Sequence, residues 1–190
     1  MAILKIAKMG HPVLAQIASP VDDPCDPAVH RLIADMIDTM YDAPGIGLAA
    51  PQVHAPLRIV MFYVPGDRLD EGEDGTAGVP LTVLINPEIT PVGDHVNEAV
   101  EGCLSLPKMA GRVRRHTEIR YRGLAPDGST VERHARGFHA RVVQHECDHL
   151  DGILYPMRMD ALTSFGYIDE LAKSATAPSG TVPQKGSDDD

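Results

Sequence analysis

Two histidines and a glutamate form the pattern in this chain whose chemistry is easiest to interpret. His145 and His149 are four residues apart, and Glu146 directly follows the first histidine. In a helix, residues four apart lie on the same face, so the two imidazoles can bind one divalent metal. A carboxylate beside such a metal can accept a proton from water. The spacing therefore predicts a hydrolytic metal site, and the alternative is a surface helix that happens to carry these side chains.

The residues around this motif fit a helix with two different faces. Advancing 100° per residue places an apolar face opposite the face that carries the histidines. Cys147 lies on the apolar face, so it cannot share their metal, and we expect a small buried side chain there. Gly137 and Gly152 are the expected helix boundaries. The apolar face consists of Ala140, Val143, Cys147 and Leu150, and the opposite face of Phe138, Val142, His145 and His149.

Composition limits the kind of protein this can be. The chain has 190 residues, of which 43% are hydrophobic and 23% charged, as expected for one globular domain. A formal net charge of −10 argues against a nucleic-acid-binding surface. No segment has the length of a membrane span, and the N-terminus does not have the pattern of a secretion signal. Cys25, Cys103 and Cys147 do not form a disulfide framework, so we expect a cytoplasmic protein.

The remaining pattern predicts helices and short strands. Asp26 and Pro27 suit the N-cap and first position of an amphipathic helix that ends near Pro44–Gly45. Asp127–Gly128 predicts a hairpin turn, and a short helix is expected after Met159. The expected strands are 57–64, 81–85, 95–105, 112–122 and 129–135.

These elements predict a single α+β domain over residues 1–173, with small mixed or antiparallel sheets packed around the metal-binding helix. Residues 66–78 are acidic and rich in glycine, and they look like an insertion. Residues 174–190 are small and polar and end in three aspartates, so we expect a disordered acidic tail.

A catalytic metal site usually has a third protein ligand, and the choice of that ligand separates the enzyme classes. One protease motif requires a histidine at position 155, where this chain has Tyr155. Glu170 could serve instead, which would make the chain a zinc endopeptidase. Cys103 is the better candidate, because it follows Gly102 at the end of an expected strand and a thiolate suits a transition metal. A metal-binding module without enzymatic activity is a further alternative.

The segment from Gly45 to Gln52 contains two glycines and two alanines, so another group can approach its backbone closely. The alternative explanation is a helix end followed by tight packing. Gln52 can donate its amide N–H to a developing oxyanion.

Three segments together resemble the peptide deformylases: GIGLAAPQ at 45–52, EGCLS at 101–105 and HECDH at 145–149. The similarity extends from about residue 3 to about residue 172 and includes the opening Gly10–Leu14. The resemblance implies that the enzyme removes the N-formyl group from the initiator methionine of nascent polypeptides and releases formate. It implies one metal, typically Fe²⁺, with Zn²⁺, Ni²⁺ or Co²⁺ as possible occupants. The implied ligands are Cys103, His145 and His149, with Glu146 as general acid and base.

The resemblance also implies how the substrate is held. The oxyanion would be bound by Gln52 and the backbone N–H of Leu104, and the peptide would lie along Ile46–Gly47 as an added strand. The stem of Arg141 would pack in the methionine pocket while its charge reaches water, unless this arginine is simply solvated. The implied substrate-binding residues are Ile46, Gly47, Gly102, Phe138, Arg141 and Val142, and the implied supporting residues are Glu101, Asp148 and Arg115.

The implied partners are N-formylmethionyl nascent chains, with the ribosome nearby. Because the chain ends in aspartates rather than in a basic helix, no tail-mediated ribosome docking is expected. Nucleic acid and membrane are not expected as partners.

Overall fold

The computed structural model describes residues 2–69 and 78–176, and the side chains to residue 173. Short 3-10 helices (η) connect several of the larger elements. In chain order the elements are η1 Pro12–Ala15, α1 Pro27–Asp42, β1 Gly47–Ala49, η2 Ala50–Val53, β2 Ile59–Val64, η3 Gly66–Arg68, β3 Val79–Pro91, β4 Val96–Cys103, β5 Leu106–His116, β6 Glu118–Leu124, β7 Thr130–Arg136, α2 Gly137–Leu150, η4 Tyr155–Arg158, η5 Leu162–Ser164, β8 Gly166–Tyr167 and α3 Ile168–Thr176.

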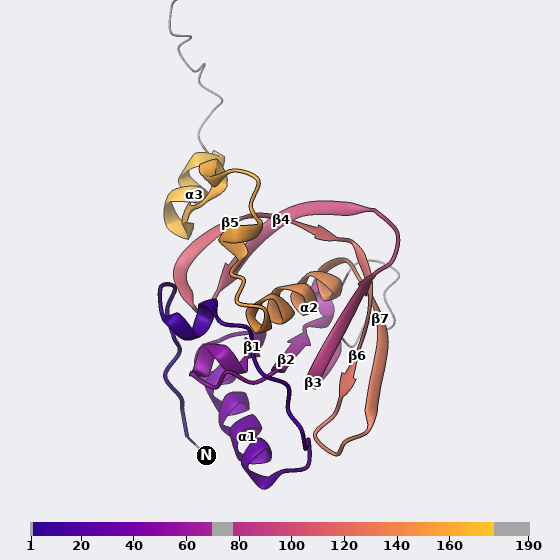
Figure 1. Cartoon of the computed structure of the whole chain (residues 1–190). Helices are drawn as coiled ribbons and strands as arrows, with labels where there is room; N and C mark the ends of the chain where they lie inside the picture. Colours follow the sequence, from indigo (N-terminus) through magenta and orange to yellow (C-terminus); the bar gives the residue numbers. More distant parts are fainter. Residues whose placement is uncertain (1, 70–77, 177–190) are drawn as a thin grey trace, which may run out of the picture.

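Two sheets enclose the central helix α2 (Figure 1). The larger sheet has the strand order β1-β2-β3-β6-β7, and the smaller has the order β4-β5-β8. Every pairing between these described strands is antiparallel. The α+β class is therefore confirmed, and the sheets are antiparallel rather than mixed.

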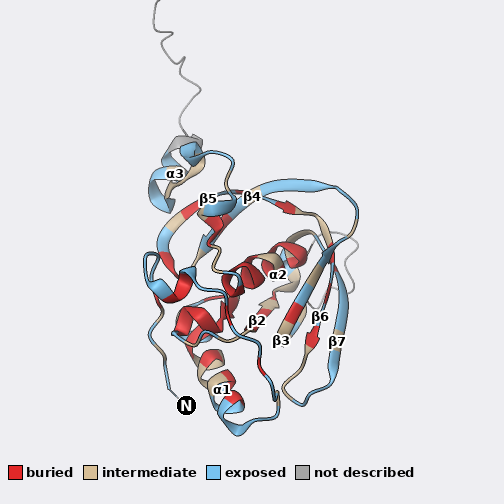
Figure 2. Cartoon of the chain, in the orientation of Figure 1, coloured by how far each residue is buried: buried red, intermediate tan, exposed pale blue. Residues whose placement is uncertain are grey.

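Strand β2 is apolar on both faces because a helix covers each of them. Ile59 and Met61 pack in the cluster that contains the apolar side of α1. Val60 and Phe62 pack on the other side, against α2. Alternate residues of a strand point to opposite faces, so a strand between two helices needs a continuous apolar run. Figure 2 shows the result as buried residues concentrated in β2 and α2.

Both long helices begin where the sequence predicts. The Asp26 side chain accepts a hydrogen bond from the Ala28 backbone N–H at 2.7 Å and caps α1. Helix α2 spans Gly137–Leu150, as its two-faced pattern indicates. The predicted short helix after Met159 is α3.

The predicted strand 112–122 is extended in the structure, but it is divided between the two sheets. Strand β5 ends at His116 and β6 begins at Glu118, and at Thr117 the chain bends from the smaller sheet into the larger. The alternation of side chains continues on both sides of this bend, and no glycine or proline marks it. The predicted turn at Asp127–Gly128 is present, with Gly128 at a φ of +80°.

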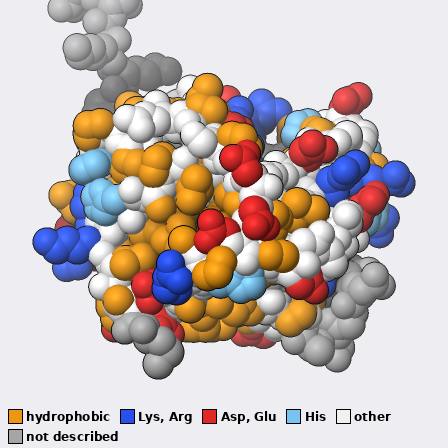
Figure 3. All heavy atoms as spheres, turned by 60° about the horizontal axis from the view of Figure 1, so that its bottom comes forward, with side chains coloured by type: hydrophobic (Ala, Val, Ile, Leu, Met, Phe, Trp, Pro, Cys, Tyr) orange, Lys and Arg blue, Asp and Glu red, His pale blue; other side chains and the backbone are white. Residues whose placement is uncertain are grey.

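The predictions for loop 66–78 and tail 174–190 lie largely outside the described residues. Within the described part, η3 covers Gly66–Arg68 and α3 continues through Thr176. None of the described helices has the length and apolar character needed to cross a membrane. On the face seen in Figure 3, acidic and apolar side chains lie together near the middle and basic side chains lie mainly at the sides. This face therefore has no broad basic surface for nucleic acid.

Buried His139 should make stability depend on pH. Burial lowers the pKa of His139 to about 4, and the positive charge of Arg133 acts in the same direction. Below pH 6.5 the unfolded chain therefore binds a proton that the folded chain does not, and stability falls as the pH drops toward 4. We expect the free energy of unfolding of the metal-free protein, measured in urea, to decrease between pH 8 and pH 5. This decrease should be about 1–2 kcal/mol larger in wild type than in His139→Gln. Equal losses in the two proteins would contradict this assignment.

Candidate metal centre and active site

The structure brings the three predicted metal ligands together from two elements. Cys103 ends β4, while His145 and His149 lie one turn apart on α2. Their ligand atoms all lie within 4.8 Å of one another, and Sγ of Cys103 is 3.4 Å from Nε2 of His149. Among the described residues, these three side chains are the group whose spacing could hold a metal ion.

The charges around Cys103 favour its metal-binding form. Burial favours the neutral thiol of Cys103, but the neighbouring His149 and His145 more than offset this and lower its pKa well below the usual value. Burial opposes protonation of His145, but Cys103 and Glu101 raise its pKa well above the usual value. The fold therefore favours a thiolate at Cys103, the form of cysteine that binds a metal. One thiolate and two imidazoles fit a divalent transition metal.

The other two candidates for the metal do not take part in this group. Cys147 is buried on the far face of α2, where burial raises its pKa, so it behaves as a small apolar side chain as predicted. Glu170 lies on α3, is exposed, and pairs with Lys173 at 2.7 Å. The structure thus gives no support to a protease site that uses Glu170.

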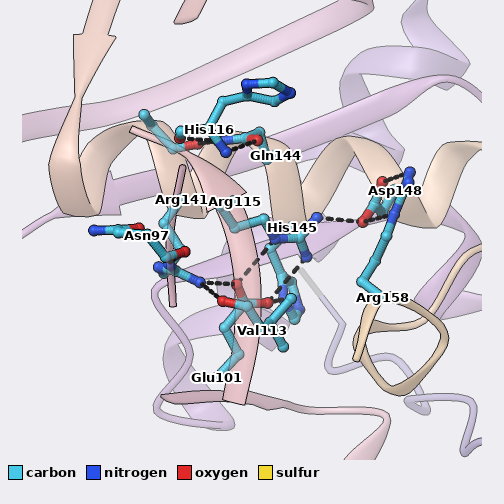
Figure 4. A network of polar contacts seen from close by, with 11 residues as sticks. Asn97, Glu101, Val113, Arg115, His116, Arg141, Gln144, His145, Asp148 and Arg158 are labelled. Carbon is cyan, nitrogen blue, oxygen red and sulfur yellow. Dashed lines mark hydrogen bonds and ion pairs between the residues drawn. The ribbon is translucent and has the colours of Figure 1, made fainter. Parts of the chain in front are cut away.

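The buried carboxylate of Glu101 contacts one ligand directly (Figure 4). Its Oε2 lies 2.8 Å from Nδ1 of His145 and 3.0 Å from Nη2 of Arg115. Burial raises the pKa of Glu101, but hydrogen bonds and positive charges from His145 and Arg115 outweigh this and lower it well below the usual range. An ionised carboxylate only accepts hydrogen bonds, so His145 donates from Nδ1, and in the neutral imidazole that binds a metal the lone pair is on Nε2.

Arg115 links the two predicted supporting carboxylates. It is buried, and it donates to Glu101 and to Asp148, which precedes His149 on α2. Arg158, which the sequence analysis missed, holds the other side of Asp148 at 2.8 Å. His149 itself has a buried Nδ1 without a hydrogen-bond partner among the described residues. The two histidines are thus held differently, His145 by a carboxylate and His149 by packing.

Glu146 lies against the backbone of β1. A Cβ atom added to Gly47 would lie within 2.6 Å of Cδ of Glu146, so only glycine leaves room for this carboxylate. The sequence analysis attributed the small residues here to a bound peptide, but Gly47 is first required by Glu146. Oε2 of Glu146 is buried and has no hydrogen-bond partner within the described chain. Burial raises the pKa of Glu146 to about 7, while the positive charges of His145 and His149 oppose this rise.

Gln52 is buried and joins the segment after β1 to the cysteine loop. Its Nε2 donates to Oγ of Ser105 at 3.1 Å and lies 3.4 Å from Sγ of Cys103. Its Oε1 accepts from the Ala49 backbone N–H at 2.9 Å. These contacts fix the amide beside the metal ligands, where its N–H groups face the site.

The N-terminal segment holds both of these segments, which the sequence did not indicate. The Ala7 N–H donates to the Gln52 carbonyl at 2.7 Å, and the Met9 N–H donates to the Ser105 carbonyl at 2.9 Å. Nζ of Lys8 donates to the Leu104 carbonyl at 3.2 Å. These contacts join residues 45 to 96 positions apart, so no local pattern could reveal them.

A cavity of about 330 Å³ opens beside the ligands and Glu146. Edge strands β1 and β4 border it on two sides. Arg68, which the sequence analysis also missed, lies over the Phe138 ring at 5.4 Å. The predicted substrate-binding residues all line this cavity, namely Ile46, Gly47, Gly102, Phe138, Arg141 and Val142, as do Gln52 and Leu104.

One expectation for this cavity is wrong. Arg141 is only 4% exposed, so its charge does not reach water, nor is it a solvated surface arginine. Its guanidinium instead donates to Glu101 at 2.7 Å. An arginine can be buried when carboxylate and carbonyl oxygens satisfy its donors, and residue spacing alone does not show whether such oxygens are close.

The fold and the site define a class of protein. A Cys/His/His donor set with a buried carboxylate, placed in a cavity between two open strand edges, is the site of a metal-dependent hydrolase.

Comparisons with known proteins identify the family. A family model described as polypeptide deformylase matches residues 3–165. Peptide deformylase 1 of Nitrosomonas europaea is 49% identical over 175 residues, which are 92% of this chain and 97% of the relative. Peptide deformylase 1 of Bordetella pertussis is 50% identical over 166 residues, which are 87% of this chain and 93% of the relative.

Solved structures agree with this result. The Met-Ala-Ser-bound class I type b peptide deformylase of Acinetobacter baumannii has a TM-score of 0.74 and 34% identity, covering 83% of this chain and 99% of that chain. The peptide deformylase of Thermotoga maritima has a TM-score of 0.73 and 35% identity, covering 85% and 100%. The chain belongs to the polypeptide deformylase family. It is a metal-dependent hydrolase that removes the formyl group from the N-formylmethionine of nascent chains.

The contact between Gly47 and Glu146 gives a test of the site geometry. In Gly47→Ala the new methyl group must displace the Glu146 carboxylate, so we expect kcat to fall about tenfold to a hundredfold while metal content stays the same. Formate release and metal analysis on the same sample measure both quantities. Gly166→Ala is a matched control, because its added Cβ would make only ordinary contacts. Unchanged turnover in Gly47→Ala would contradict the proposed placement of Glu146.

Proposed function

We propose specific roles for the residues of this deformylase site. Cys103, His145 and His149 hold one divalent metal, and Glu146 acts as general base and then general acid. The observation that carries this proposal is the placement of three donor atoms within 4.8 Å, beside a buried glutamate with an unpartnered oxygen in the same cavity.

Ferrous iron is the proposed metal, and zinc, nickel or cobalt can use the same donors because a thiolate with two imidazoles accepts several divalent ions. When bound, such an ion supplies Lewis-acid chemistry, lowering the pKa of water and polarising a carbonyl. Glu101, supported by Arg115, keeps His145 in the orientation that presents Nε2 to the ligand group. Asp148 and Arg115 connect that support to the helix turn that carries His149.

Glu146 moves the proton in the proposed reaction. Its carboxylate accepts a proton as water attacks the formyl carbon, and it delivers a proton to the leaving amine as formate departs. A pKa raised by burial to about 7 suits both roles, because the group can lose and gain a proton near neutral pH.

Gln52 and Leu104 are the proposed oxyanion donors. The Gln52 amide is held by Ala49 and Ser105, and its second N–H, whose nitrogen lies 3.4 Å from Sγ of Cys103, is the one proposed to donate to the oxyanion as negative charge develops beside the thiolate. The backbone N–H of Leu104 follows Cys103 directly and is the second proposed donor.

The formyl peptide is proposed to lie extended along the open edge of β1 at Ile46–Gly47, with Gly102 opposite. Main-chain hydrogen bonds to an edge strand bind a peptide without regard to most of its side chains, which suits an enzyme that acts on many nascent chains. Phe138, Val142 and the stem of Arg141 form the proposed wall for the methionine side chain. That the related Acinetobacter baumannii structure holds bound Met-Ala-Ser supports a peptide that begins with methionine as the ligand of this chain. The proposed setting is the cytoplasm near the ribosome, without docking through the acidic tail.

The role of Glu146 can be tested by an isosteric change. Glu146→Gln keeps the shape of the side chain but cannot accept a proton, so we expect normal metal content and a loss of turnover of about 10²- to 10⁴-fold. The measurement is formate release from formyl-Met-Ala-Ser, with anaerobic metal analysis of the same preparation. Turnover close to that of wild type would exclude Glu146 as the base.

The third ligand can be tested by comparing two variants. Cys103→Ala should lose both metal and activity, because it removes the thiolate of the donor group. Glu170→Gln should retain both, because Glu170 is exposed and contacts Lys173. The opposite result would favour a glutamate-containing protease site, and an iron-loaded wild type that releases no formate would contradict the proposal as a whole.

A further inference from the structure

Arg141 lines the substrate cavity, yet its charged end is directed away from it. Nη1 donates to Oε1 of Glu101 at 2.7 Å and to the Val113 carbonyl at 2.8 Å. Nη2 donates to the Asn97 side-chain oxygen at 2.7 Å and to the Asn97 carbonyl at 3.1 Å. In Figure 4 the guanidinium lies between Asn97 and Glu101. Four acceptors thus hold the guanidinium, so a peptide in the cavity would contact only the aliphatic stem of Arg141.

Arg141 and His145 use the same carboxylate. They are four residues apart on α2, so they lie one above the other on one face of the helix. Arg141 contacts Oε1 of Glu101, and His145 contacts Oε2. A carboxylate is planar and rigid, so holding Oε1 also fixes the direction in which Oε2 meets the imidazole. The guanidinium can therefore control the orientation of a metal ligand that it does not touch.

The same side chain also connects α2 to the smaller sheet. Its acceptors belong to β4, through Asn97 and Glu101, and to β5, through Val113. Cys103 is the last residue of β4, two positions after Glu101. Arg141 thus joins the helix that carries two donors to the strand that carries the third, by hydrogen bonds that are buried at Glu101 and Val113 and part-buried at Asn97.

We propose that Arg141 is a positioning residue, which acts through Glu101 to set the orientation of His145 and the spacing between α2 and the strand of Cys103. This inference rests on the proposed metal-ligand set and replaces the view of Arg141 as a residue that recognises substrate through its charge. Its effect is on metal binding and kcat, whereas a residue of the pocket wall affects KM. Charged groups that orient metal ligands typically change affinity or activity by about 10–100-fold when removed.

Arg141→Met is the test variant, because methionine keeps an unbranched apolar stem and removes the guanidinium. Glu101 retains Arg115 and His145, so the change does not leave this carboxylate buried without a partner. We expect Co²⁺ affinity, measured against a competing chelator, to fall about tenfold, with a shifted thiolate-to-cobalt absorption band. We expect kcat for formyl-Met-Ala-Ser to fall similarly at saturating metal, with KM changed less than twofold. Arg141→Lys should restore part of the affinity, because an ammonium keeps the charge but cannot form the same fork of hydrogen bonds.

Two further variants keep the test decisive. Arg122→Met removes an exposed arginine on β6 and should leave cobalt affinity, spectrum and kinetics as in wild type. Asn97→Ala removes one acceptor of Arg141, while Glu101 and the carbonyls of Val113 and residue 97 still hold its buried guanidinium, and it should lower cobalt affinity about two- to threefold in the same direction. It answers the question even if Arg141→Met does not fold.

Unchanged cobalt binding would overturn the inference. If Arg141→Met or, where that protein does not fold, Asn97→Ala binds cobalt as tightly as wild type with an unchanged band, Arg141 does not position the ligands. A rise in KM alone would assign it to the substrate wall instead. Because the cobalt titration does not depend on turnover, a wild type that releases no formate would contradict the proposed function without deciding the role of Arg141.

Discussion

The geometry of the site depends on one buried carboxylate, that of Glu101. It accepts hydrogen bonds from His145 and Arg141 on helix α2 and from Arg115 on strand β5. A carboxylate this deeply buried would be costly if it were ionised without partners. With them it remains ionised, fixes the proton on Nδ1 of the histidine, and connects β4, β5 and α2 around the metal donors. The charged groups around it form one connected network rather than separate ion pairs.

The second constraint is the close approach of α2 to strand β1. Glu146 can reach the cavity only because Gly47 has no side chain, and the same strand offers its open edge to the cavity. The position of the carboxylate and the position of an extended peptide are therefore set by one short strand. Burial at this contact raises the pKa of Glu146 to about 7, so close packing also prepares the group for proton transfer.

Local patterns in the sequence predicted much of the fold. The apolar spacing of α1 and α2 and the Asp26 cap of α1 correspond to the observed helices, because these signals depend on neighbouring residues. The division of residues 112–122 between two sheets at Thr117 was missed, because side chains alternate on both sides of this bend and no special turn residue is present. Strand β2 is apolar throughout because α1 covers one face and α2 the other, and the positions of these helices are known only from the structure.

The sequence by itself determined the chemistry of this protein, because the types and spacing of Cys103, His145, Glu146 and His149 define the donors and the base. Four residues make about one helical turn, so the shared face of the two histidines follows from their spacing alone. Only the tertiary structure decided where Arg141 directs its charge, and that the N-terminal segment holds Gln52 and the cysteine loop. Those contacts join residues 28 or more positions apart. Their formation depends on how the sheets and helices pack, which no local spacing encodes.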